Sequence, residues 1–290
     1  MGWRNRSLTI LLVLASLTAT GCGVTRRLAV SSMIPILEKT VESIYRDQDL
    51  ETVQKGIPAN LLLLRGLCES SPGDAELWAM TTQLYFYYGF GFVEEESADQ
   101  ARLVYLQGRD LGRRSLARRD WFRTDRPLDE FERDLGHARR EDVPLLFWTV
   151  ANWASWINLS MDDPAAVADL PVAEAILRRV LELDGGYFLG LPFALAGTLE
   201  ATKPVMMGGD PESSRAHFEA AFKAAGRKLL IFQTLYAQYY CRSVLDQEGF
   251  VRSLDEVLKA PADIEPDYRL LNEVARRRAA RLMEQKDDLF

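Results

Sequence analysis

Apolar residues recur along most of the chain at intervals of three and four positions, which is typical of amphipathic helices. Runs in which polar and apolar residues alternate, as strands require, are nearly absent. Clusters of Gly, Pro and Asp separate the periodic segments at 71–74, 184–186, 208–211 and 260–263. The pattern therefore predicts an all-α protein built from short, separated helices.

The periodic segments also resemble one another. A small residue is followed four positions later by a large apolar one, as in Ala101 with Tyr105 and Ala173 with Leu177. The small residue lets two helices approach, and the large one fills the groove of the next helix pair. We expect a single tetratricopeptide-like α-solenoid over residues 22–290, made of stacked antiparallel helix hairpins. The expected hairpins lie at about 31–70, 75–118, 143–184, 187–226 and 229–260, followed by a C-terminal capping helix at 267–286.

The N-terminus follows a different pattern. Arg4 and Arg6 precede an uncharged run that is shorter than the roughly 20 apolar residues of a membrane span and is typical of an export signal. The run ends in small residues directly before Cys22, which resembles a bacterial lipobox. This predicts a signal peptide at 1–21 and lipidation of the Cys22 thiol, with a plain secretory signal as the alternative. The sequence leaves open whether the inner or the outer membrane holds the anchor.

Composition and charge exclude several classes of function. The formal net charge is -7, so an anionic nucleic acid is not expected as a partner. Three Cys are too few for a disulfide scaffold, and two His leave little material for a metal site. Cys68 and Cys241 are expected as buried free thiols, with a disulfide between them as the alternative. No nucleophile, P-loop or paired carboxylate motif is present, so we expect no enzyme, no metal and no cofactor.

Two aromatic clusters are the candidate binding residues. The stretch from Tyr85 to Glu94 contains six aromatic residues, and its glycines Gly89 and Gly91 are expected to break the helix. One helix end cannot point six rings inward, so some are expected to line a pocket or a partner surface. A bulky core junction is the alternative, and for Trp148 and Trp153 a core position and a cavity wall both stay open. The candidates are Tyr85, Tyr88, Phe90, Phe92, Glu94 at the polar rim, Trp148 and Trp153.

Two further segments admit a simple interpretation. Gly208-Gly-Asp210 has the letters of a cyclase motif, but it lies between helices, so Asp210 is expected to cap a helix that begins at Pro211. In residues 118–142, 15 of 25 residues are charged. This stretch is expected to be a solvated loop or short helix, and its alternative role is to dock a partner.

The order of these pieces resembles one known family, the T-component of TRAP (tripartite ATP-independent periplasmic) transporters. The resemblance implies a lipid-anchored periplasmic protein and a homotrimer with an apolar pore or cavity through each protomer. It also implies docking to the extracytoplasmic solute-binding protein, with a small ligand, hydrophobic ones included, handed between them. A lipoprotein scaffold for outer-membrane or envelope assembly is the alternative function. The resemblance rests on the lipobox, the Tyr85–Glu94 block, Trp148-x4-Trp153, Gly208-Gly-Asp210 and the end Leu270-Leu-Asn-Glu-Val-Ala275.

Overall fold

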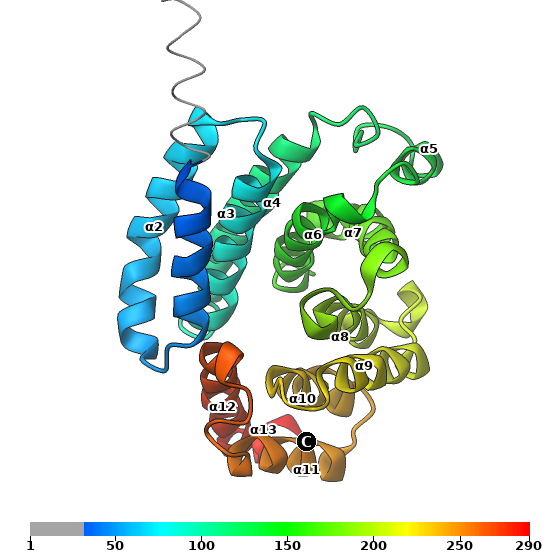
Figure 1. The fold of residues 1–290 in the computed structure, drawn as a ribbon. Helices are drawn as coiled ribbons and strands as arrows, with labels where there is room; N and C mark the ends of the chain where they lie inside the picture. The colour runs from blue at the N-terminus through cyan, green and yellow to red at the C-terminus, as the bar shows by residue number, and fades with distance from the viewer. Residues whose placement is uncertain (1–31) are drawn as a thin grey trace, which may run out of the picture.

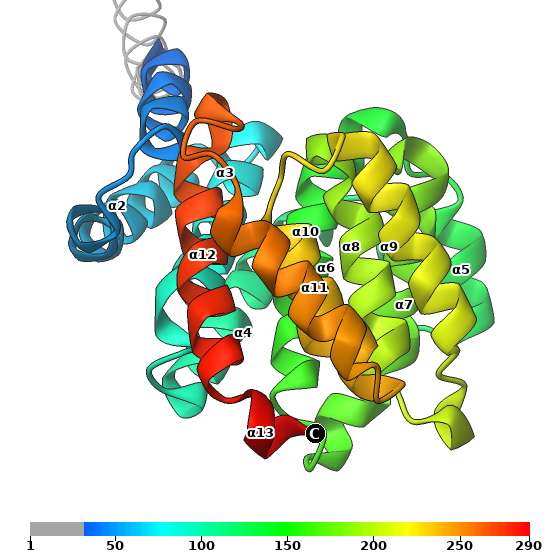
Figure 2. The same ribbon diagram turned by 90° about the horizontal axis from the view of Figure 1, so that it is seen from below.

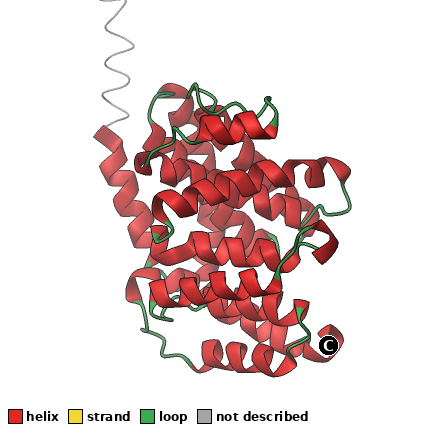
Figure 3. Cartoon of the chain, turned by 90° about the vertical axis from the view of Figure 1, so that its right-hand side faces the viewer, coloured by secondary structure: helices red, strands yellow, loops and turns green. Residues whose placement is uncertain are grey.

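The structure, a computed structural model, describes residues 32–290 and consists of helices joined by short loops, with no strand among these residues (Figure 3). The predicted signal peptide and Cys22 lie outside the described residues. The first helix covers residues 32–45. The longer helices that follow are α2 (Leu50–Ser70), α3 (Ala75–Tyr88), α4 (Ala98–Leu116), α5 (Leu128–Leu135), α6 (Val143–Asn158), α7 (Pro164–Asp184), α8 (Tyr187–Thr202), α9 (Pro211–Ala225), α10 (Ile231–Leu235), α11 (Gln247–Lys259), α12 (Arg269–Glu284) and α13 (Lys286–Leu289). The short elements between them are η1 (Gly89–Val93), η2 (Arg140–Asp142), η3 (Val205–Met207), η4 (Tyr236–Cys241) and η5 (Pro266–Tyr268).

Successive helices pair and stack along a curved path, which runs in Figure 1 from α2 through α6 and α8 to α11. The pair α3 and α4 contacts α6, α6 contacts α7 and α8, and α8 packs along α9. The fold predicted from the sequence, an all-α solenoid of stacked helix hairpins, is confirmed in the described residues.

The last long helix closes this path on itself. α12 packs against α10 and α11 and also contacts α2, so it lies between the first and the last helix pairs (Figure 2). From α12, Arg278 Nη2 donates a hydrogen bond of 2.6 Å to the backbone oxygen of Phe90 in η1. Arg277 bonds the backbone oxygen of Gly91 in the same way. The capping helix therefore joins both ends of the stack and encloses the interior.

Side-chain caps explain where several helices begin. Asp74, Ser97 and Asp163 each accept a hydrogen bond from a backbone N–H in the first turn of α3, α4 and α7. Asp210 accepts one from the backbone nitrogen of Glu212 at 3.0 Å, and Pro211 is the first residue of α9. The predicted role of Asp210 as a helix cap is confirmed.

The predicted helix break at Gly89 and Gly91 is wrong. Gly89 has right-handed helical dihedrals, and α3 continues directly into η1, which is a π-helix. Packing explains why position 89 is a glycine, since a Cβ atom there would lie 2.6 Å from Cε1 of Tyr105. The glycine thus lets the Tyr105 ring of α4 pack onto the helix backbone, and the wider π-helix turns the residues that follow.

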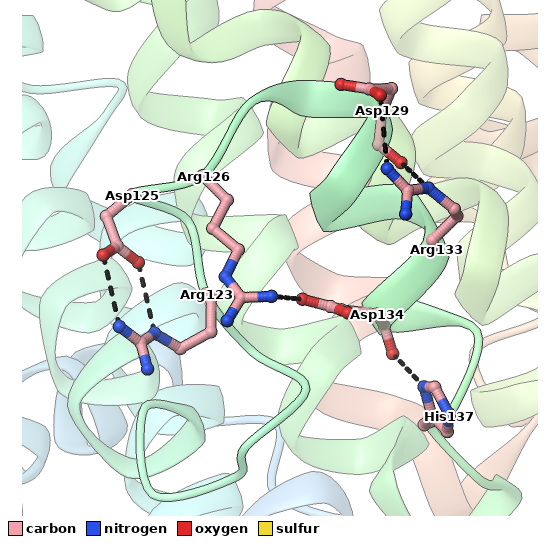
Figure 4. A network of polar contacts seen from close by, with 7 residues as sticks. All are labelled: Arg123, Asp125, Arg126, Asp129, Arg133, Asp134 and His137. Carbon is pink, nitrogen blue, oxygen red and sulfur yellow. Dashed lines mark hydrogen bonds and ion pairs between the residues drawn. The ribbon is translucent and has the colours of Figure 1, made fainter.

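The charged stretch 118–142 contains the short helix α5 on the surface of α7. Its apolar residues Phe131 and Leu135 are buried, while its charged side chains pair close by. Arg126 Nη1 lies 2.7 Å from Asp134 Oδ2, and Figure 4 shows the neighbouring pairs. The stretch therefore forms the short surface helix that was expected, and docking of a partner here stays a prediction.

Cys68 and Cys241, the two cysteines of the described residues, are free and buried. Burial raises the pKa of the Cys68 thiol to about 11 and that of the Cys241 thiol to about 12. Both residues act as small apolar side chains in the core, as predicted.

Candidate functional site

The inner faces of the closed stack surround an apolar cavity of about 50 Å³. This space admits a few water molecules or a short alkyl chain. Its walls come from α3, η1, α6, α8, α10, η4 and α12, so nearly every helix pair contributes. The apolar wall is formed by Phe86, Tyr87, Phe90, Phe147, Ala151, Ala154, Leu191, Leu195, Leu199, Ile231, Leu235 and Leu271.

Polar side chains also line this apolar cavity. Asn158 Nδ2 donates a hydrogen bond of 3.4 Å to the Tyr239 hydroxyl oxygen. Glu94 lines the cavity as well, and its Oε2 accepts a hydrogen bond of 2.5 Å from the Tyr105 hydroxyl. Burial, followed by the charge of Glu94, raises the pKa of both Tyr105 and Tyr239 well above the ordinary value, so both remain protonated donors. The remaining polar lining residues are Ser155, Thr198 and Thr202.

A buried arginine balances the charge of Glu94. Arg278 has a side chain that is only 3% exposed, and its Nη2 lies 3.4 Å from Glu94 Oε1. The guanidinium also lies 3.9 Å from the centre of the Phe90 ring, a cation–π distance. Burial alone would lower the pKa of Arg278, but Glu94 and the neighbouring tyrosines and Glu95 raise it. The arginine therefore stays charged and neutralises the carboxylate inside the protein.

A second cavity, of about 590 Å³, lies between residues 32–45, α3, the start of α6 and the start of α8. We call it the acidic cavity, because five carboxyl groups line it and no Lys or Arg does. A hydrogen bond that Glu76 donates to Glu38, followed by burial, raises the pKa of Glu76 to about 7, so the Glu76 carboxyl keeps its proton to a higher pH than an ordinary glutamate does. The acidic lining residues are Glu38, Glu42, Glu76, Glu141 and Asp142.

Four rings, Tyr87, Phe147, Trp148 and Phe188, separate the two cavities and form what we call the aromatic partition. The first two line the apolar cavity and the last two line the acidic cavity. Trp148 is the centre of the group, with ring centroids at 5.4 Å from Tyr87, 4.8 Å from Phe147 and 5.5 Å from Phe188. Such tilted and edge-on pairs stabilise the group beyond the burial of apolar area.

The backbone that carries Phe188 is strained. Phe188 and Leu189 have φ values of 48° and 57°, and Gly190 follows with φ 90°. Left-handed dihedrals are unfavourable for residues with a Cβ atom, so the fold must hold them in place. The regular part of α8 therefore begins only at Leu191, and the left-handed turn aims residues 187 and 188 at the acidic cavity.

The structure brings only some of the predicted binding residues to a cavity. Phe90 and Glu94 line the apolar cavity, and Trp148 lines the acidic cavity, so a role of these three in binding stays a prediction. The other four line neither cavity.

Those four residues take part in packing within the protein, and a role of theirs in binding also stays a prediction. Tyr85 is buried beside Gly108, and Phe92 is buried under Arg277. Trp153 is 1% exposed, donates from Nε1 to Asp169 at 2.8 Å and packs under two arginines of α4. Tyr88 is half-buried against the core.

The sequence analysis did not identify α8, which contributes as many residues to the apolar cavity as α6 does. The run Leu191–Leu199 is apolar on nearly every side in sequence, and a helix of that kind must be surrounded by protein. That signal was available. The acidic cavity has no comparable signal in the sequence, since its carboxylates come from segments about 40 to 100 residues apart.

Within residues 32–290, no group of His, Cys, Asp and Glu side chains is arranged to hold a metal ion. No helix of the same part of the chain combines the length and the apolar character that crossing a membrane would need.

Comparison with known proteins identifies the family. No curated protein matches the chain. The family model described as TRAP transporter T-component matches residues 46–290. This family comprises extracytoplasmic accessory subunits of transport systems. Because the match covers nearly the whole described chain, including both cavities except for the helix 32–45, the protein belongs to the TRAP transporter T-component family.

Proposed function

We propose that the protein is a lipid-anchored periplasmic accessory subunit of a TRAP-type transport system. It docks the solute-binding protein of that system and passes a small ligand, hydrophobic ones included, through the apolar cavity. The anchor is the acylated Cys22, and the working assembly is a homotrimer of tetratricopeptide-like protomers. The family match favours this function over a scaffold for envelope assembly.

The observation that carries the proposal is the apolar cavity inside the closed stack. A helical stack that served only as a scaffold would fill its interior with side chains, because empty space in a core is unfavourable. Here twelve apolar side chains surround free space, and polar groups from Glu94, Asn158 and Tyr239 lie beside them. This combination suits a small molecule with an apolar body and one hydrogen-bonding end.

Filling the cavity tests the ligand part of the proposal. Leu195→Trp on α8 places a larger side chain in the free space, and Leu103→Trp on the exposed side of α4, where Leu103 is 60% exposed, is the matched control. We expect binding of 1-hexanol, measured by isothermal titration calorimetry, to weaken by about tenfold or more only in the first variant. Circular dichroism must show the same helix content in both. Equal binding in both variants would remove the cavity from the proposal.

Docking and anchoring need separate measurements. The full chain is expected to bind the solute-binding protein of the same transport system on a biosensor surface and to elute as three copies in light scattering. Cys22→Ala is expected to move the protein from the membrane fraction to the periplasmic fraction. A chain that captures envelope-assembly proteins and no solute-binding protein would favour the scaffold function instead.

A further inference from the structure

The acidic cavity has the size and the access of a small-molecule site. Its volume of about 590 Å³ falls inside the range of about 300–1,000 Å³ that ligand pockets occupy. The aromatic partition lies between it and the apolar cavity, with two of its rings lining each space. The proposed transport of an apolar ligand makes no use of it.

The walls of this cavity present aromatic rings whose polar hydrogens are already engaged. Trp148 Nε1 donates to the Tyr187 hydroxyl at 3.0 Å. The amide nitrogen of Gln83 donates to the Tyr45 hydroxyl at 2.5 Å. Burial raises the pKa of Tyr187 to about 12, so this ring stays neutral. The wall therefore offers π faces from the partly exposed rings of Tyr45, Tyr187 and Phe188, whereas Trp148 is fully buried and its indole N–H is not available to an anion.

The rings also form one connected group around the cavity. Phe188 lies 5.9 Å from Tyr45 and 5.5 Å from Trp148, measured between ring centroids. Tyr187 lies 6.4 Å from Trp148 by the same measure. Several aromatic rings around one space are the arrangement that binds alkylammonium groups, because each ring carries negative potential on its face.

The carboxylates determine the sign of the charge that a ligand of this cavity carries. Glu38, Glu76 and Glu141 line the cavity, and none of them has a Lys or Arg partner within the described residues. Two of the three, Glu38 and Glu76, share a hydrogen bond that only a proton allows. A cation bound between the rings and the carboxylates would relieve the repulsion between Glu38 and Glu76, as the proton does when no ligand is bound.

An organic cation fits this arrangement better than a metal ion does. Metal ions need several oxygen ligands within about 2.6 Å of one point, and the described residues contain no group of carboxylates arranged in that way. The carboxylates are instead distributed around a wide space together with apolar surface from Val41, Ala79 and Met80.

We propose that the acidic cavity binds an organic cation, of the class of quaternary or protonated alkylamines, between its aromatic rings and its carboxylates. This inference rests on the proposed function for its place in transport, and it adds that a ligand with an ammonium head can be recognised beside the apolar cavity.

The test compares choline with 3,3-dimethyl-1-butanol, its uncharged isostere, by isothermal titration calorimetry on the full chain. Choline is expected to bind about tenfold or more tightly than the alcohol, because only choline gains from the ring faces and the carboxylates. Equal affinities would overturn the inference, and so would displacement of choline by millimolar calcium at constant ionic strength.

Two variants locate the site, and a third is the control. Glu76→Gln keeps the shape and removes a charge, and Phe188→Leu removes a ring. Each is expected to weaken choline binding severalfold, whereas Glu248→Gln on the exposed start of α11 leaves it unchanged. Only Phe188→Leu should also weaken binding of the alcohol. Choline binding that is unchanged in both cavity variants would contradict the site.

The same preparations distinguish this inference from the proposed function. The proposed function places neither docking to the solute-binding protein nor binding of 1-hexanol at Glu76, which does not line the apolar cavity. If docking fails and choline still binds, the transport role is wrong and the cation site stands. If docking and hexanol binding are intact while choline fails to bind, only the cation site is wrong.

Discussion

The apolar cavity and the acidic cavity share one aromatic partition but treat charge in opposite ways. At the apolar cavity, Glu94 is paired with Arg278 and receives a hydrogen bond from Tyr105. At the acidic cavity, Glu38 and Glu76 face each other without a basic partner in the described residues. The same helices, α3, α6 and α8, supply residues to both.

This difference follows from access to solvent. A charge that is cut off from water must be neutralised by the protein, because an unpaired buried charge is strongly unfavourable. A carboxylate in an open cavity keeps part of its hydration and can remain unpaired until a ligand arrives. The charge of Glu94 at the apolar cavity is therefore neutralised by the protein itself, whereas three of the five carboxyl groups at the acidic cavity, those of Glu38, Glu76 and Glu141, have no basic partner among the described residues.

The largest expected effect comes from removing the buried Arg278, which tests whether the charge of Glu94 must be neutralised by the protein. Arg278→Met leaves Glu94 without its basic partner inside the protein and removes one of the three arginines beside Glu95, so the free energy of unfolding should fall by about 3–5 kcal/mol. Urea denaturation followed by circular dichroism measures the change.

The control for this variant lies one turn away on the same helix. Arg281 also contacts Glu95, but its side chain is 43% exposed. Arg281→Met should therefore cost less than about 1 kcal/mol. Equal losses in the two variants would mean that Arg278 contributes no more than a surface ion pair does.

A methyl group at Gly89 tests the packing beside Glu94. In Gly89→Ala the new Cβ would lie 2.6 Å from the Tyr105 ring, which the hydrogen bond to Glu94 holds in place. The free energy of unfolding should fall by about 1–3 kcal/mol. Differential scanning calorimetry gives the change through the shift in Tm.

Gly56 on α2 is the matched site for that substitution. Nothing lies within 4 Å of a Cβ built at Gly56, which has an ordinary helical environment. Gly56→Ala should stabilise the protein by about 0.5–1 kcal/mol, because alanine loses less backbone entropy on folding. Changes of the same sign at both glycines would show that helix propensity outweighs the Tyr105 contact.

The smallest expected effect concerns the acidic cavity and pH. Because the pKa of Glu76 is raised to about 7 in the folded protein, the folded state binds more protons than the unfolded state between pH 4.5 and 7. Stability should therefore fall slightly as pH rises through this window. Urea denaturation at pH 5 and pH 8 should show this slope in the unaltered chain and a flatter one in Glu76→Gln. A slope that is unchanged in the variant would assign the effect to other groups.

The helix pairs could be predicted because their causes are local. The spacing of Ala101 and Tyr105 identified α4, and the order Gly209-Asp210-Pro211 identified the start of α9, since a cap acts over a few residues. The π-helices η1 and η4 left no such signal. In η1 the ring that fits over Gly89 is Tyr105 of the next helix, and in η4 Tyr239 meets Asn158 of α6, so residues of other helices pack against both elements.

The candidate site could be predicted only in part for the same reason. The aromatic block was expected to hold more rings than one core junction can bury, but four of its six rings are buried and the other two are half-buried. Its spacing did not reveal which rings turn toward the cavity. Tyr85 packs beside Gly108 of α4, whereas Phe90 reaches the cavity after the shift into the π-helix. Glu38 and Glu141 meet at one cavity only because the stack is curved, and no local pattern encodes that curvature.

The left-handed turn at Phe188 and Leu189 stores conformational strain in the wall of the acidic cavity. Each residue with a Cβ atom in this conformation costs roughly 1–2 kcal/mol, and tertiary contacts hold the turn. A glycine at position 189 would release that tension and also loosen the ring beside it. At this turn, higher thermal stability of the protein and a more rigid cavity wall therefore require opposite changes. Selection for one of them acts against the other.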